Sequence, residues 1–127
     1  MAEADHLYQE HRYEEALVIY DQVIALFPEY AFALLGKGET LLTLKRDQES
    51  LDILDKAIQV DPKVTSAHFH QSRAQALCNL QRYEESLAAY DKALGINSRN
   101  TRLYDEKATV LFYLRRYDEA LKIYEQL

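Results

Sequence analysis

The sequence predicts an all-α protein built as an array of antiparallel helix hairpins. One amphipathic helix is written four times in 127 residues, starting at Arg12, Arg46, Arg82 and Arg116. The copies read RYEEALVIYDQVI, RDQESLDILDKAI, RYEESLAAYDKAL and RYDEALKIYEQL. An array needs the same helix in every unit because each unit must offer its neighbour the same buried face. The 3 Gly and 2 Pro residues leave little of the turn chemistry that a multi-stranded sheet needs, so short connections between helices are favoured.

The spacing of the copies sets the length of the repeat. Tyr13, Asp47, Tyr83 and Tyr117 hold equivalent places, with separations of 34, 36 and 34 residues. The longer interval includes DPKVTSA after Asp61, where the corresponding earlier link is FPEYA. We therefore expect the two extra residues to lie in a loop and to leave the helices unchanged.

Each unit also carries a helix before the repeated one. These first helices are expected over AEADHLYQE, YAFALLGKGETLLTL, SAHFHQSRAQALCNL and NTRLYDEKATVLFYL. With 48% hydrophobic residues the chain has enough apolar side chains for a core. We expect one domain over residues 1–127, with hairpin units at about 1–30, 31–66, 67–100 and 101–127.

Small residues recur where the two helices of a hairpin must touch. On the first helices they are Ala4, Gly38, Ala74 and Ala108, and on the second helices they are Ala16, Ser50, Ser86 and Ala120. Small side chains let the two backbones approach closely, and larger apolar residues surround them at helical spacing. Residues that stop a helix follow the second helices, namely Pro28, Pro62 and, in the third unit, Asn97 and Ser98.

Charge and composition exclude several classes of partner. The net charge is −6 with no basic run, so the chain would repel nucleic acid and anionic membrane surfaces. It has no apolar stretch behind a basic start and no run of about 18 apolar residues, as a membrane helix needs. Cys78 is the only cysteine, so nothing points to an oxidising compartment. We expect a cytoplasmic protein that binds neither nucleic acid nor membrane.

The chain resembles the tetratricopeptide repeats over its whole length, with about three and a half repeats. The resemblance rests on the period, on Pro28 and Pro62, and on pairs of a small and an aromatic residue, which are Ala16 with Tyr20, Ser86 with Tyr90 and Ala120 with Tyr124. Unit two departs from the pattern, with Asp47 and Leu54 where the other units have tyrosine. The resemblance implies a right-handed superhelical solenoid whose first helices line a concave groove that binds a segment of another protein.

The resemblance assigns this groove to one stripe of each first helix. In unit two the stripe is Phe32, Leu35, Gly36, Glu39, Leu42 and Thr43; in unit three it is His68, Gln71, Ser72, Gln75, Cys78 and Asn79; in unit four it is Arg102, Asp105, Glu106, Thr109, Phe112 and Tyr113. Their spacing places each set on one helical face. The groove is expected to be apolar at one end, hydrogen-bonding in the middle and acidic at the other. The alternative is that neighbouring helices partly cover the apolar members and the rest is solvated surface.

No catalytic constellation, cofactor site or metal site is found in the sequence. His68 and His70 project from nearly opposite sides of a helix and so do not share one ion; we expect His70 to be buried and His68 to face the groove. Acidic pairs such as Glu14 with Glu15 recur in first helical turns, where the helix dipole favours negative charge. Cys78 has no sequence partner that would activate it, and no Gly-rich phosphate loop appears.

One known activity of the resembling family is not carried over to this chain. Members that hold the C-terminal carboxylate of chaperone tails use Lys, Asn and Arg side chains on their first helices. The matching places here are Met1, Asp5, Gly36, His68 and Ser72. These residues do not form such a carboxylate clamp.

The leading hypothesis is a non-enzymatic interaction scaffold for a peptide segment that carries basic and apolar residues. Phe32, Leu35 and Leu42 would anchor the peptide, and Glu39, Asp105 and Glu106 would select its basic residues. The alternative is a self-associating structural module, because the terminal helices keep apolar residues that we expect to be thinly covered: Leu7, Tyr8, Leu17, Leu121, Tyr124 and Leu127. A third interpretation is an accessory domain cut from a larger protein, since both ends of the chain fall inside a repeat.

Overall fold

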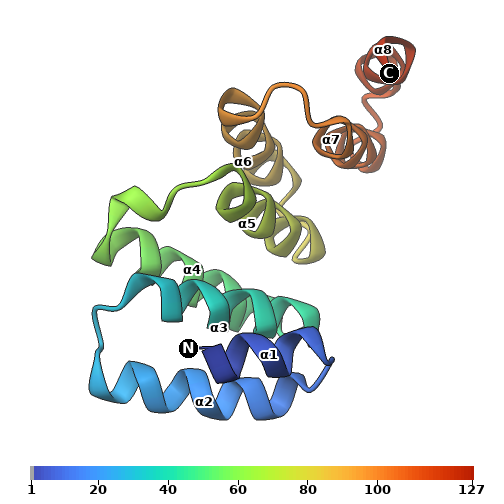
Figure 1. The fold of residues 1–127 in the computed structure, drawn as a ribbon. Coiled ribbons are helices and arrows are strands. Elements are labelled where there is room, and N and C mark those ends of the chain that lie inside the picture. The colour runs from blue at the N-terminus through green and yellow to red at the C-terminus, as the bar shows by residue number, and fades with distance from the viewer. Residues whose placement is uncertain (1) are drawn as a thin grey trace. The chain divides into compact units, whose positions relative to one another are not determined.

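The computed structural model describes residues 2–127, which form eight α-helices and one short 3₁₀ helix (Figure 1). The helices are α1 (Ala2–Gln9), α2 (Tyr13–Leu26), α3 (Ala31–Thr43), α4 (Asp47–Val60), α5 (Ala67–Asn79), α6 (Tyr83–Ile96), α7 (Thr101–Tyr113) and α8 (Tyr117–Gln126), with η1 (Pro62–Val64) after α4. The all-α prediction is confirmed, and each predicted helix is present. Within the described part of the chain, every helix is too short or too polar to pass through a bilayer.

The chain divides into two compact units, Met1–Thr65 and Ser66–Leu127. In the first unit α1 packs on α2, α2 on α3 and α3 on α4. In the second unit the same succession holds for α5, α6, α7 and α8. Each unit therefore contains two helix hairpins, and the division falls next to the junction expected between the second and third repeats.

A tight turn with one left-handed residue joins the two helices of every hairpin. His11, Lys45, Gln81 and Arg115 hold this place, with φ between 61° and 64°. The residue that follows donates its backbone N–H into the last turn of the first helix, as from Arg12 N to Leu7 O at 2.8 Å. These bonds satisfy carbonyls that the end of a helix leaves unpaired. The turn is therefore short and alike in all four hairpins.

The recurring small residues are buried where the helices of a hairpin touch, as the sequence predicts. In the second hairpin the Ser50 hydroxyl donates to the Gly38 carbonyl at 2.6 Å, and in the third the Ser86 hydroxyl donates to the Ala74 carbonyl at 2.8 Å. A β-carbon added at Gly38 would come within 2.7 Å of Leu54 Cδ2. The second hairpin therefore needs glycine where the others tolerate alanine.

The two extra residues of the longest interval lie outside the α-helices, as expected. They fall in the link between α4 and α5, which contains the 3₁₀ helix η1. Asp61 Oδ1 accepts a hydrogen bond from Lys63 N at 3.0 Å, and Ser66 Oγ accepts one from Phe69 N at 3.1 Å. The Asp61 side chain therefore caps the start of η1, and the Ser66 side chain caps the start of α5.

Candidate functional site

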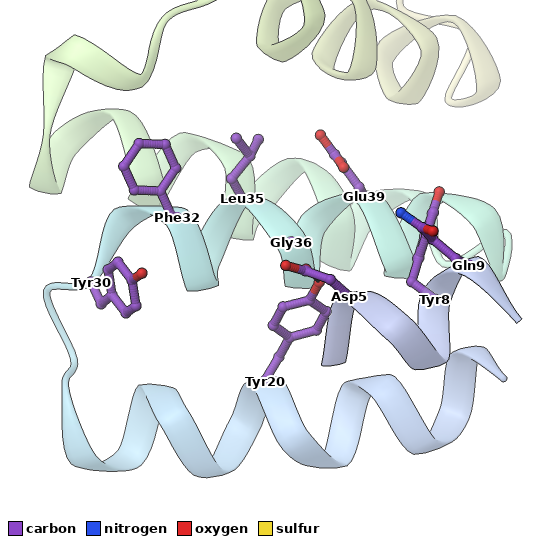
Figure 2. Close-up of a pocket in the computed structure, with 9 residues that line it drawn as sticks. All are labelled: Asp5, Tyr8, Gln9, Tyr20, Tyr30, Phe32, Leu35, Gly36 and Glu39. Carbon is purple, nitrogen blue, oxygen red and sulfur yellow. Dashed lines mark hydrogen bonds between the residues drawn. The ribbon is translucent and has the colours of Figure 1, made fainter. Parts of the chain in front are cut away.

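A cleft opens in the first unit between α1 and α3, above α2 (Figure 2). Its volume is about 550 Å³. The side chains that line it come from three helices and from the loop before α3: Asp5, Tyr8, Gln9, Tyr20, Tyr30, Phe32, Leu35, Gly36 and Glu39. We call this the Tyr20 cleft. Four of the six residues predicted for the unit-two stripe line it, and Leu42 and Thr43 lie beyond it.

Tyr20 forms the floor of this cleft. Its side chain rises from α2 toward α1 and α3, and its hydroxyl donates to Asp5 Oδ1 at 2.7 Å (Figure 2). The ring lies directly under Gly36, where an added β-carbon would be 2.5 Å from two ring carbons. Any larger residue at position 36 would displace the tyrosine. Burial, together with the hydrogen bond and charge of Asp5, raises the pKa of Tyr20, so the phenol stays protonated and acts as a donor.

The lining of the Tyr20 cleft combines aromatic rings with negative charge. Tyr8, Tyr20, Tyr30 and Phe32 supply the rings, and Asp5 and Glu39 supply two carboxylates. The residues that line the cleft include no Lys, Arg or His. Ring faces and carboxylate oxygens both carry negative electrostatic potential. A lining of this kind therefore attracts a positively charged group at the end of an apolar side chain.

The rim of the cleft at the start of α3 is apolar and open. Phe32 is 59% exposed and Tyr30 is 39% exposed, and their rings meet edge to face with centroids 6.3 Å apart. Leu35 is half-buried one helical turn further along α3. At the other end, Tyr8 Oη lies 3.1 Å from Thr43 Oγ1, which ties α1 to α3. The predicted anchors Phe32 and Leu35 therefore lie together, and Leu42 is half-buried outside this cleft.

A second cleft of about 340 Å³ lies in the second unit, between α5 and α7. It is lined by Gln75, Cys78, Asn79, Tyr90, Arg102, Asp105, Glu106, Thr109, Val110 and Tyr113. We call this the Tyr90 cleft. All but Tyr90 and Val110 belong to the predicted unit-three and unit-four stripes. Cys78 is half-buried here, and its pKa is raised by burial and by the charge of Glu106, so its thiol is a weak nucleophile.

Glu106 is the centre of the Tyr90 cleft, and its carboxylate is occupied by donors from its own chain. The four donors are Gln71 Nε2 at 2.9 Å, Gln75 Nε2 at 2.9 Å, Tyr90 Oη at 3.1 Å and Arg102 Nε at 3.1 Å. Only 18% of the Glu106 side chain is exposed. Our expectation that Glu106 selects a basic ligand residue therefore needs correction, because the network already includes a guanidinium. The neighbouring Asp105 is exposed.

Four members of the predicted unit-three and unit-four stripes line neither cleft. His68 is exposed, and Gln71 is turned inward to Glu106. Ser72 is only 4% exposed, so we correct its placement on the groove surface: its short side chain is covered by packing. Phe112 is 58% exposed and packs edge to face on Tyr117, with centroids 5.2 Å apart, outside the Tyr90 cleft. His70 is buried as expected, with its ring 5.3 Å from that of Phe69.

The expected thin cover over the first helices is wrong. Leu7 is 8% exposed and Leu17 is 7% exposed, because the two turns of α1 are enough to cover α2, and Leu7 packs with Ala4, Ala16 and Tyr20. Tyr8 is half-buried and lines the Tyr20 cleft. On α8, by contrast, Leu121 is 56% and Tyr124 45% exposed, and Leu127, directly after this helix, is 53% exposed. Of the six apolar residues that we expected to be thinly covered, only Leu121, Tyr124 and Leu127 are therefore exposed, and all three belong to the C-terminal end of the chain.

Sequence reasoning did not include Asp5, Tyr8, Gln9, Tyr20 and Tyr30 in the cleft. In the sequence, Asp5 stands only at a place that lacks a clamp residue, and Tyr20 stands only as the aromatic partner of Ala16 in the repeat pattern. Tyr20 is buried, at 2% exposure, but its ring and hydroxyl still form the floor. A usable signal is the coincidence of Gly36 with an aromatic residue on the preceding helix, because a missing β-carbon lets a ring pack directly against the helix backbone.

The fold is similar to that of several solved structures. A crystal structure of MamA superposes with a TM-score of 0.86 at 20% identity, covering 96% of this chain and 70% of that one. MamA from residue 41 to its end, from Desulfovibrio magneticus RS-1, gives 0.90 at 19% identity, with coverages of 97% and 68%. YrrB, described as a TPR protein with an unusual peptide-binding site, gives 0.84 at 22% identity, with coverages of 96% and 62%. No curated protein sequence matches the chain.

The repeat family is shown by comparison with family models. A tetratricopeptide repeat model matches residues 7–78, which is more than half of the chain, and a second tetratricopeptide repeat model matches residues 67–100. The two matches together extend over residues 7–100, which leaves out the start of the first hairpin and the last hairpin. The helix hairpins, the buried small residues and the repeat period agree with this assignment. The chain belongs to the tetratricopeptide repeat family.

Proposed function

We propose that the chain is a protein-interaction module that binds a peptide segment of a partner protein and carries out no chemistry on it. The observation that carries the proposal is the Tyr20 cleft, where an apolar rim at Phe32 and Leu35 adjoins the carboxylates of Asp5 and Glu39. Membership of the repeat family supports the general role, and the described peptide-binding site of YrrB shows that a protein of similar fold binds peptides. The partner segment is apolar and basic, because it must complement the rim and the carboxylates.

Selection from a random peptide library displayed on phage tests this proposal. We expect the enriched peptides to carry Lys or Arg next to large apolar residues. Phe32→Ala and Leu35→Ala should each reduce capture, since they remove the apolar contacts of the rim. Ile96→Ala is the matched control, because Ile96 is a 55% exposed aliphatic residue on α6 that lines neither cleft. Enrichment of mainly acidic peptides, or an equal loss in the control, would contradict the proposal.

A second candidate function is self-association through the last hairpin. Its support is the exposed apolar face of α8, where Leu121 and Tyr124 stand at the places that Leu87 and Tyr90 bury on α6. Light scattering over a concentration series, on the chain and on a Leu121→Lys, Tyr124→Glu variant, tests it. Association that the variant abolishes supports this function, and a monomer at high micromolar concentration refutes it.

A further inference from the structure

A lysine–aspartate ion pair joins the two hairpins within each unit. In the first unit Lys37 on α3 pairs with Asp21 on α2, with Nζ 2.7 Å from Oδ1. In the second unit Lys107 on α7 pairs with Asp91 on α6, also at 2.7 Å. Both lysines stand directly before the small residue of their helix, and both aspartates stand directly after the tyrosine of theirs. The ion pair is therefore a repeated part of the contact between consecutive hairpins.

The lysine shares one face of its helix with buried residues. On α7, Leu103 stands four residues before Lys107 and Val110 three residues after it, so the three lie on one face. Leu103 and Val110 are each 1% exposed. On α3, Ala33 and Thr40 hold these two places and are each 0% exposed. A first helix that covers a second helix therefore carries its lysine between two residues that the contact buries.

The last helix, α8, repeats the covered surface of α6 but leaves it exposed. Leu121, Tyr124 and Glu125 stand where α6 has a buried leucine, Tyr90 and Asp91. Leu121 is 56% and Tyr124 45% exposed. Glu125 is exposed and has no ion-pair partner among the described residues. We call these three residues the α8 face. It presents the leucine, the ring and the carboxylate that a first helix covers on α6.

We propose that the α8 face is a docking surface for a basic amphipathic helix of a partner protein. The partner helix lies on α8 as α7 lies on α6, with its apolar residues over Leu121 and Tyr124 and a lysine against Glu125. Burial of the apolar side chains provides most of the affinity, and the partly exposed ion pair provides selectivity. The α8 face is separate from the Tyr20 cleft, so this inference goes beyond the peptide binding proposed above.

Charge favours a partner helix over a second copy of the chain on the α8 face. In a head-to-tail association of two copies, α1 of one copy would take the place of the covering helix. Its residue at the place of Lys37 is Glu3, which is exposed. Glu3 would then face Glu125 of the other copy, and like charges in contact repel. The α8 face therefore selects a helix that carries lysine against the first helix of its own chain.

Backbone amide NMR of the full chain with a designed peptide tests the docking surface. The peptide acetyl-SAELAQAKQALAQALA-amide carries two leucines four residues before and three residues after its lysine, as in α7, and its many alanines favour a helix. A second version has glutamate in place of lysine. We expect the lysine version to shift the signals of Leu121, Tyr124 and Glu125. It should bind about tenfold more tightly than the glutamate version.

A charge reversal on α8 sharpens this test. Glu125→Lys should reverse the preference, so that the glutamate version binds about tenfold more tightly than the lysine version. Leu121→Ser should weaken the binding of both versions, since it removes apolar contact. Asp52→Lys is the matched control, because it changes the net charge equally at an exposed carboxylate on α4, and it should keep the preference of the parent. Glu125 is exposed, so Glu125→Lys keeps the fold, and the dispersion of its spectrum verifies this.

Several outcomes would overturn the docking surface. They are the absence of shifts on α8 with the lysine version at millimolar concentration, equal affinities of the two versions, and an unchanged preference in Glu125→Lys. Association of the chain with itself through α8 that the lysine version does not displace would also overturn it, in favour of a second copy. Peptide binding at the Tyr20 cleft is tested separately, by library capture with Phe32→Ala and Leu35→Ala, so either proposal can fail without the other.

Discussion

The Tyr20 cleft and the Tyr90 cleft lie at the same register of the repeat, one in each unit of the chain. In the first, Gly36 packs directly on the tyrosine ring and adds no side chain to the cleft, and the volume is about 550 Å³. In the second, Glu106 fills the equivalent place and collects four donors, and the volume is about 340 Å³. The backbone supplies the same concavity twice, and the side chain at one position determines how much of it remains open.

This difference separates the structural use of a groove position from its use for binding. Glu106 ties α5, α6 and α7 together through hydrogen bonds, so it stabilises the second unit. Gly36 makes no such bond and instead allows close packing on Tyr20. Polar groups on the inner face of a repeat therefore indicate a ligand site only where their hydrogen bonds are not already made within the chain.

The largest expected effect concerns the hairpin that carries the Tyr20 cleft. Gly38→Leu should lower the free energy of unfolding by about 3 kcal/mol, at the upper end of typical overpacking costs, since even a β-carbon would lie 2.7 Å from Leu54 Cδ2. Urea denaturation measures the change. Ala108→Gly, at the equivalent place in the second unit, is the comparison and should cost less, because it only removes a methyl group. Equal stability of Gly38→Leu and the parent would show that the helix contact is misplaced.

Removal of the Glu106 carboxylate should be the next largest effect. Glu106→Gln replaces one acceptor oxygen by an amide that faces donors, and we expect a loss of about 2 kcal/mol in the free energy of unfolding. Asp5→Asn should cost less than about 1 kcal/mol, since Asp5 is exposed and accepts a single hydrogen bond. Chemical denaturation of both variants, with Asp105→Asn as the control on the exposed side of α7, measures the difference. Equal losses for Glu106→Gln and Asp105→Asn would contradict the network.

Conversion of one cleft into the other is the third prediction. Gln75→Asp, Arg102→Phe, Glu106→Gly and Thr109→Glu together reproduce the Asp5, Phe32, Gly36 and Glu39 positions of the first unit. We expect this quadruple variant to bind a library-selected basic peptide at its second unit, with peptide-dependent amide shifts at Tyr90 that the parent does not show. Amide NMR measures this gain. The quadruple variant should also be less stable than the parent, because the Glu106 network is lost.

Glu106→Gly alone is the control for this conversion. It opens the cleft but keeps Arg102, whose positive charge would repel a basic peptide, so it should show no new peptide-dependent shifts at Tyr90. Shifts in the single variant as large as those in the quadruple variant would show that space, and not the charge pattern, separates the two clefts.

The smallest expected effect is a difference in acid sensitivity between the units. His70 in the second unit stands where the first unit has Leu34. Burial, with the nearby charges of Lys92 and Arg73, lowers the pKa of His70 below its usual 6.5. The folded state therefore binds a proton less readily than the unfolded chain. His70 should leave stability unchanged above about pH 6.5 and reduce it as the pH falls below that value.

The measurement compares the parent with His70→Leu, which copies the first unit. Denaturation at pH 7.5 and at pH 5 should show a smaller decrease for the variant than for the parent. His6→Leu, at a 70% exposed histidine side chain on α1, is the control and should follow the parent. An identical pH dependence of the parent and His70→Leu would refute a role of His70 burial in the acid sensitivity of the second unit.

The sequence by itself determined the class of fold, the hairpin repeat and the family. Three features carry this prediction: a period near 34 residues, apolar residues at helical spacing and small residues at the helix contacts. Each depends on local geometry that every copy repeats, so four copies make the repeat pattern easier to recognise. The burial of Ala16, Ser50, Ser86 and Ala120 followed directly from this pattern. The stripe of Phe32, Leu35, Gly36 and Glu39 could also be predicted, because one helical face is fixed by spacing alone.

Only the tertiary structure decided which groove residues remain open to a ligand. Leu7 and Leu17 are buried because α1, although short, still covers α2, which no count of residues reveals. Asp5 reaches Tyr20, and Gln71 and Gln75 reach Glu106, across helices that are separated in sequence. A helical periodicity specifies which side of its own helix a residue occupies. Whether its charge is used within the chain or left for a partner depends on distances between helices, and packing sets those distances.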